Sequence, residues 1–240
     1  MANKLSPIFI VGFFALVICA VFAFSFVIHD ETHTEEPVDT AGSITGITVS
    51  AFTNDNTLRA YLSCVEDPST HLFYCFGGEG HKDIFAYDTE TANIIPKSAA
   101  FSGSRSYLGC AHSSATNKIY CLGGRGKDDF TDEIVEYDPE TDKLLIMKER
   151  LPSPRAHYSC VENSDTKKIY CVTGSYEELY NDVIEYDPVE HRVRTKEFLR
   201  LHDITPRYQA MCAEDSSTNI IYCFGGADNT EKKERFWTRL

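Results

Sequence analysis

The sequence predicts an all-β fold assembled from repeated units of four short antiparallel strands. Three observations support this prediction: a motif that recurs four times, a Cys pair at the same spacing in each copy, and a strand-like composition after residue 30. The 15 Phe and 13 Tyr favour strands, and no long amphipathic helical pattern follows the first 30 residues. Outside the N-terminal region about 170 of the 240 residues remain, which suits one domain.

An apolar run occupies residues 8–28 and is interrupted only by Ser25. About 20 such residues match the hydrocarbon thickness of a bilayer. Lys4 precedes the run, and Asp30 and Glu31 follow it. This charge asymmetry predicts a cytoplasmic N-terminus and a C-terminal domain outside the cytoplasm.

We therefore expect a short cytoplasmic segment at residues 1–7 and a single-pass transmembrane signal anchor at 8–28. Cleavage as a signal peptide near Val21–Ala23 is the alternative, and export holds in both cases. Cys19 is expected to be a thiol buried in the membrane. The acidic segment 29–43 is typical of a flexible stalk.

Each of the four copies of the repeat opens with Arg and reaches its first Cys five residues later. The copies start at residues 59, 105, 155 and 207, which are 46, 50 and 52 residues apart. A polar turn and a short strand ending in Tyr-Cys-x-Gly-Gly follow, and the first three copies add a third strand ending in Tyr-Asp and then a fourth strand. This period indicates a propeller or a solenoid, and four antiparallel strands per unit are typical of a propeller blade.

The Arg start, the strand ending in hydrophobic-Tyr-x-x-Gly-Gly and the Tyr-Asp strand together resemble the kelch repeat family. The resemblance extends from Arg59 to Gly226 and implies a kelch-type β-propeller domain over residues 44–226, with a polar tail at 227–240. It implies about three complete four-stranded blades and a partial fourth. The third copy departs from the pattern at Thr173, where the other copies carry Gly, and the Trp that kelch repeats often carry in the fourth strand is missing.

The partial fourth blade raises the question of how the ring closes. Residues 44–52 alternate β-branched and small residues, so we expect this segment to pair with the strand ending at Gly226. Unpaired edge strands invite association. Self-association into a larger ring is one expectation, and a longer propeller of which residues 228–240 are a remnant is the other.

Eight of the nine cysteines form four pairs at a spacing of eleven residues. Residues at this spacing in a hairpin with a central turn lie opposite each other, within reach of a disulfide. We expect four disulfides within repeats, as in an oxidising compartment; buried free cysteines are the alternative, and zinc is a weaker one. The expected pairs are Cys64–Cys75, Cys110–Cys121, Cys160–Cys171 and Cys212–Cys223.

The kelch resemblance implies a ligand face built from the loops between second and third strands and from the loops leading into first strands. The loops of the first kind are 79–82, 125–131 and 175–181. The candidate ligand-binding residues are Tyr61, Tyr107, His157, Gln209, His81, Lys82, Arg125, Lys127 and Tyr176. The alternative for the recurrent residues is structural: the repeat arginines belong to the scaffold, and Asp88, Asp138 and Asp187 close turns.

No catalytic constellation, metal-binding spacing or phosphate-binding loop is found in the sequence, so we expect no catalytic residue, cofactor or metal. The net charge of −13 and the scattered basic residues argue against a nucleic-acid partner. We expect a non-enzymatic binding module outside the cytoplasm that recognises a protein or a glycan through its loops. The alternatives are a carbohydrate-acting kelch-type enzyme (oxidase, epimerase or lyase) and a fragment of a larger propeller without a ligand of its own.

Overall fold

The computed structural model describes residues 42–44, 47–49, 59–176, 179–180, 182–197, 208–227 and 237–239. Within these residues the fold is all-β, as the sequence predicts. No helix in the described ranges is long and apolar enough to cross a bilayer. The expected anchor at 8–28 lies outside the described residues, as does the stalk except for its last two residues.

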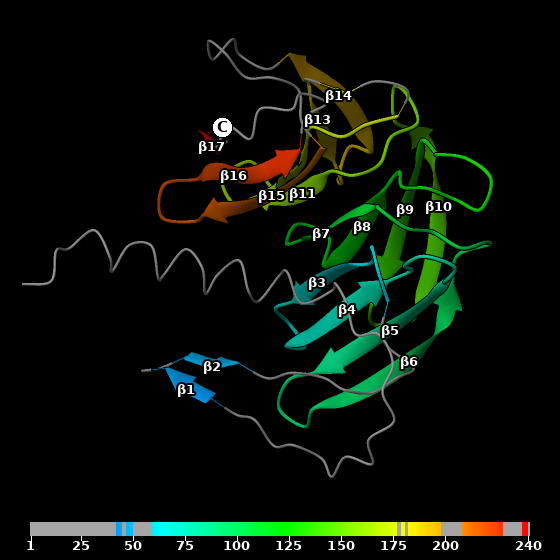
Figure 1. Ribbon diagram of the computed structural model, residues 1–240, viewed down its shortest axis with the longest axis vertical. Helices are drawn as coiled ribbons and strands as arrows, with labels where there is room; N and C mark the ends of the chain where they lie inside the picture. Colours follow the sequence, from blue (N-terminus) through cyan, green and yellow to red (C-terminus); the bar gives the residue numbers. More distant parts are fainter. Residues whose placement is uncertain are drawn as a thin grey trace, which may run out of the picture. The chain divides into compact units, whose positions relative to one another are not determined.

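The chain divides into two compact units, residues 1–58 and residues 59–240. The first unit contains a two-stranded hairpin of β1 (Gly42–Ile44) and β2 (Ile47–Val49), in which Ile44 lies opposite Ile47 (Figure 1). The sequence led us to expect this segment to pair with the strand ending at Gly226, and that expectation is wrong. Only two residues, the second a glycine, separate the strands, and such short loops favour the local pairing.

The second unit contains three four-stranded antiparallel sheets in which the strands follow sequence order, and one three-stranded sheet (Figure 1). We call these sheets repeats 1 to 4. Repeat 1 has β3 (Ser63–Asp67), β4 (Leu72–Phe76), β5 (Asp83–Asp88) and β6 (Asn93–Ala100). Repeat 2 has β7 (Gly109–Ser113), β8 (Lys118–Leu122), β9 (Glu133–Asp138) and β10 (Lys143–Arg150). Repeat 3 has β11 (Ser159–Asn163), β12 (Lys168–Val172), β13 (Asp182–Asp187) and β14 (Arg192–Glu197).

Repeat 4 has β15 (Tyr208–Asp215), β16 (Ile220–Ala227) and β17 (Trp237–Arg239). The sequence predicted only the first two of these strands. In the structure β17 pairs antiparallel with β16, with Trp237 opposite Phe224 and Arg239 opposite Tyr222. The segment expected to be a polar tail therefore supplies a third strand.

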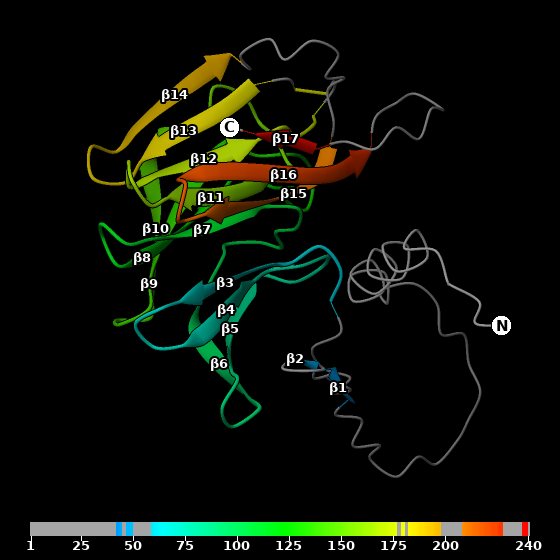
Figure 2. The ribbon, with the colours of Figure 1, turned by 90° about the vertical axis from the view of Figure 1, so that its left-hand side faces the viewer.

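The first strands of the four repeats lie next to one another in the order β3, β7, β11, β15 (Figure 2). The fourth strands β6, β10 and β14 also contact one another in order. Each sheet therefore packs face to face on the next one in the sequence, and its first strand lies closest to the first strands of its neighbours.

Each sheet has a leading face, which carries the Cys pair, and a trailing face on the opposite side. The trailing face of each of repeats 1 to 3 packs on the leading face of the following repeat. Between repeats 1 and 2 the trailing-face residues Phe76 and Ile84 meet the leading-face residues Ile119 and Val135, all at most 1% exposed. Equivalent positions fill the other two interfaces, so three apolar cores of the same design hold the repeats together.

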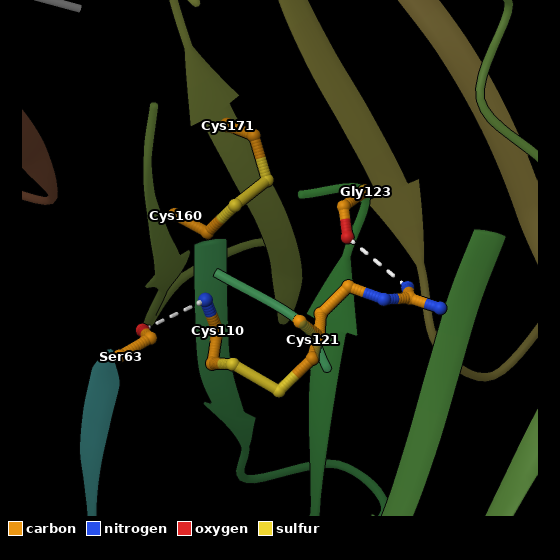
Figure 3. Close-up of a disulfide and its surroundings, with 7 residues drawn as sticks. Ser63, Cys110, Cys121, Gly123, Cys160 and Cys171 are labelled. Carbon is orange, nitrogen blue, oxygen red and sulfur yellow. Dashed lines mark hydrogen bonds between the residues drawn. A yellow bond between two sulfur atoms is a disulfide. The ribbon is translucent and has the colours of Figure 1, made fainter. Parts of the chain in front are cut away.

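All four predicted disulfides are present: Cys64–Cys75, Cys110–Cys121, Cys160–Cys171 and Cys212–Cys223, each with Cα atoms 4.1 Å apart. Each pair stands directly opposite on the first two strands of its repeat. In Figure 3 the amide of Cys110 donates to Ser63 Oγ of the preceding repeat at 3.3 Å. The four disulfides indicate an oxidising environment outside the cytoplasm.

The recurrent charged residues serve the scaffold, as the structural alternative expected. Buried guanidinium groups reach the acidic residue that opens the third strand of the same repeat. The ion pairs are Arg59–Asp83 at 2.5 Å, Arg105–Glu133 at 2.5 Å and Arg155–Asp182 at 2.7 Å. Arg207 lies outside the described residues.

The recurrent aspartates at the ends of the third strands close turns, as the sequence predicts. In each case one carboxylate oxygen accepts the backbone N–H of the residue two positions on. The pairs are Asp88 with Glu90, Asp138 with Glu140, and Asp187 with Val189.

Candidate functional site

The four candidate residues that follow the repeat arginines by two positions form a continuous row in the structure. The amide of Tyr107 donates to the carbonyl of Tyr61 at 2.9 Å, and the amide of His157 donates to the carbonyl of Tyr107 at 3.0 Å. The amide of Gln209 donates to the carbonyl of His157 at 2.7 Å. The backbone thus forms a ladder that runs from repeat to repeat.

The side chains of this row contact one another in order. The rings of Tyr61 and Tyr107 stack, with centroids 4.1 Å apart and planes inclined by 26°, and the ring of His157 is tilted by 45° against Tyr107, with centroids 3.9 Å apart. Gln209 continues the row, with its Nε2 atom 3.4 Å from Nδ1 of His157. We call Tyr61, Tyr107, His157 and Gln209 the stacked row.

The backbone of the stacked row is strained. All four residues have positive φ values, 63° for Tyr61, 56° for Tyr107, 63° for His157 and 59° for Gln209. A left-handed conformation costs a non-glycine residue about 1–2 kcal/mol. A strained conformation persists only where the surrounding structure holds the residue in place, and residues strained in this way cluster at functional sites.

Further aromatic rings surround His157. The ring of Phe130 lies 6.1 Å from His157 and 5.2 Å from Tyr176, and the ring of Tyr208 lies 5.9 Å from His157. Tyr176 was a candidate from the sequence, whereas Phe130 and Tyr208 were not singled out. The sequence did contain a feature that could have identified Phe130: it is the one aromatic residue of the mostly polar loop 125–131.

Tyr107 and His157 are both neutral near pH 7. Burial raises the pKa of Tyr107 well above its ordinary value, and the Tyr61 hydroxyl and the Glu79 carboxylate act in the same direction. Burial lowers the pKa of His157, and the nearby Arg125 guanidinium lowers it further. The row therefore presents uncharged hydroxyl, imidazole and amide groups.

The other candidates lie on loops at the same end of the sheets. Lys82 and Lys127 are exposed, and Arg125 forms isolated bridges with Ser106 and Phe130. His81 is partly buried, with Nδ1 3.7 Å from Asp83, and its carbonyl accepts the Arg105 amide. The structure brings Arg125 close to the stacked row and places Tyr176 against Phe130, which neighbours His157. Among the described residues no hydrogen bond, ion pair or ring contact joins Lys82, Lys127 or His81 to the row.

A cavity of about 280 Å³ lies between the first strands of all four repeats. The residues that line it lie one to three positions after the stacked-row residue of each repeat, so the row stands at one end of the cavity. Its lining consists of Leu62, Ser63, Cys64, Leu108, Gly109, Cys110, Tyr158, Ser159, Cys160, Met211 and Cys212.

In the part of the chain that the structure describes, no group of three or more His, Cys, Asp or Glu residues could hold a metal ion. Comparison with known proteins gives no match to any family model and none to any curated protein.

Proposed function

We propose that this chain is a kelch-type β-propeller module that binds a protein partner through the stacked row. The regular succession of four-stranded sheets supports the propeller architecture. The Arg and Asp positions that carry the resemblance each have a repeated structural task.

The stacked row is the observation that carries this proposal. Four strained residues from four repeats converge at one end of a cavity, where their polar groups stand side by side. The ring of Tyr107 stacks on that of Tyr61 and also contacts the tilted ring of His157, so it lies between its two neighbours in the row. Sugar recognition by stacking uses free ring faces, whereas hydroxyl, imidazole and amide groups suit the peptide groups and polar side chains of a protein. We therefore favour a protein ligand.

Binding rather than catalysis is the proposed activity. A Tyr base or nucleophile needs a lowered pKa, and the pKa of Tyr107 is raised. The ring of His157 is tilted by 45° against that of Tyr107, and its Nδ1 atom lies 3.4 Å from Nε2 of Gln209. Among the described residues no carboxylate forms an ion pair or hydrogen bond with this ring. These contacts position the imidazole as part of a recognition surface.

The proposed location is the outer side of a membrane, with the module held by the apolar segment at residues 8–28. The four disulfides support the compartment. The length of the apolar segment and the charges at its two ends support the anchor. Protease added to intact cells should digest the repeats, whereas release of a mature protein starting near Phe24 would contradict the anchor.

A displayed library of random peptides, selected on the full chain in detergent, tests the function. We expect enriched peptides whose affinity falls at least about tenfold in His157→Ala and Tyr107→Ala, as for central interface residues. His71→Ala is the matched control: His71 also has a positive φ, 57°, but lies in the turn between β3 and β4 at the opposite end of the sheet. Its substitution should leave peptide binding unchanged.

A glycan array on the same protein covers the alternatives. Failure to enrich peptides, or peptide binding that His157→Ala leaves intact, would refute the proposed function. Bound and unchanged glycan would indicate a lectin, and conversion of a glycan, detected by mass spectrometry, would indicate an enzyme.

A further inference from the structure

The trailing face of repeat 4 exposes a position that is buried in every other repeat. The residue after the second Cys is Phe76, Leu122 and Val172 in repeats 1 to 3, and each of these side chains is 0% exposed beneath the following repeat. The same position in repeat 4 is Phe224, which is 55% exposed. An apolar residue that is buried three times is thus open in the fourth copy.

The neighbours of Phe224 extend this apolar surface. Met211 lies directly opposite Phe224 on β15 and is 60% exposed. Ala213 is exposed and lies opposite Tyr222, whose ring stacks on that of Phe224 with centroids 6.4 Å apart. We call Met211, Ala213, Tyr222 and Phe224 the open trailing face.

The leading face of repeat 1 is open in the complementary sense. Its Cys64 is exposed, whereas the equivalent Cys110 and Cys160 are 6% and 9% exposed. Its Phe73 is partly exposed, and the equivalent residues in the later repeats, Ile119, Ile169 and Ile221, are at most 3% exposed. This face has the residue types that cover a trailing face at each internal interface.

The backbone ladder of the stacked row ends with complementary groups. Within the described residues it runs from the Tyr61 residue in repeat 1 to Gln209 in repeat 4. At each step the later residue donates its amide to the carbonyl of the earlier one. A further step would join the carbonyl of Gln209 to the amide of another Tyr61, which is a donor and acceptor pair that a second copy of this chain supplies.

We propose that the open trailing face of repeat 4 binds the leading face of repeat 1 in a second copy, and that two copies close a ring of eight repeats. Contacts between two different faces form either rings or open filaments. Propellers contain about four to eight blades, so a ring of two copies is at the upper end of this range and leaves no place for a third. The closure rests on the propeller architecture proposed above, but not on the ligand.

The mass of the full chain in detergent, measured by light scattering with the detergent contribution subtracted, tests this proposal. We expect twice the polypeptide mass of 27.0 kDa. Phe224→Asp and Met211→Asp should each raise the dimer dissociation constant about tenfold or more, since each places a charge in an apolar interface. Leu145→Asp is the matched control, because Leu145 is 58% exposed on the outer strand β10.

A mixing experiment distinguishes unlike from like faces. Phe73→Asp damages the leading face and Phe224→Asp damages the trailing face, so each variant alone should be monomeric. A mixture of the two retains one intact interface per pair and should regain dimer. Peptide mapping of the four disulfides in each variant verifies that its repeats are folded.

A monomer at concentrations of tens of micromolar would overturn the proposal. A dimer that Phe224→Asp and Met211→Asp leave unchanged would also overturn it, because association through residues 8–28 predicts that result. A dimer sensitive to Phe224→Asp but not to Phe73→Asp would show that two trailing faces meet, which contradicts the proposed ring.

Discussion

Thr173 occupies a position where the other three repeats carry glycine, and replacing it with glycine should stabilise the protein. Its φ of 67° matches the values of 61° at Gly77 and 52° at Gly123. At these glycines an added Cβ would lie 2.1 Å from the Arg105 carbonyl oxygen and 2.4 Å from the Arg155 carbonyl oxygen. The backbone at this point of the repeat is therefore shaped for a residue without a side chain.

The expected change in the free energy of unfolding on Thr173→Gly follows from four contributions. A non-glycine residue in the left-handed region costs about 1–2 kcal/mol, and Thr173 Oγ1 is buried without a hydrogen-bond partner in the described structure, which costs about 1–3 kcal/mol. Against these, glycine costs about 0.5–1 kcal/mol in chain entropy, and the lost methyl group about 0.8 kcal/mol. We expect Thr173→Gly to raise the free energy of unfolding by about 1–2 kcal/mol.

Urea unfolding with the disulfides intact measures this effect as a shift of the midpoint at constant slope. Thr195→Gly, on the exposed outer strand β14, gives the ordinary cost of the same substitution, about 0.5–1 kcal/mol of lost stability. Gly123→Thr should destabilise the protein strongly. If Thr173→Gly lowers stability as Thr195→Gly does, the assignment of strain to Thr173 is wrong.

Three further predictions concern the scaffold. Replacing Cys160 and Cys171 together with Ser should lower the free energy of unfolding by about 2–4 kcal/mol in chemical denaturation; an unchanged midpoint would contradict this. Burial alone would raise the pKa of Asp67, but hydrogen bonds from Ser69 and Thr70 outweigh it and hold the pKa below the ordinary 3.8. Its contribution to stability is therefore present above pH 3.8 and is lost as the pH falls through the lowered value, so Asp67→Asn should flatten the stability profile there, and an unaltered profile would refute the role. Arg155→Met should cost about 3–5 kcal/mol in the same denaturation assay by leaving Asp182 without its partner, and Asp182→Leu in the same chain should recover part of it; a double variant no more stable than the single one would count against the ion pair.

The features that recur with the repeat could be predicted from the sequence. The spacing of eleven residues predicts that Cys110 and Cys121 stand opposite each other, because the register of a hairpin follows from its turn. The position of Asp138 after a strand predicts its turn in the same way. These residues depend on local geometry, which the chain repeats.

Features that depend on distant or variable segments could not be predicted. The strand β17 shares none of the Tyr-Asp pattern of the other third strands, and it forms because β16 offers an edge to pair with. Phe130 lies in a loop of variable length, and its position beside His157 depends on the path of that loop. The stacking of the row was also beyond the sequence, because it requires the relative placement of whole sheets.

All four cross-links lie within repeats, between the first and second strands, and this arrangement determines how the molecule responds to a pulling force. Within the described residues no disulfide joins one sheet to the next, so under tension the sheets separate at their apolar interfaces before any hairpin opens. Each disulfide then keeps the segment between its two cysteines, which are 11 residues apart, from extending. At about 3.3–3.6 Å per residue, each hairpin shortens the fully stretched chain by roughly 35 Å. Reducing agents should therefore lengthen the stretched molecule in about four discrete steps, one for each hairpin.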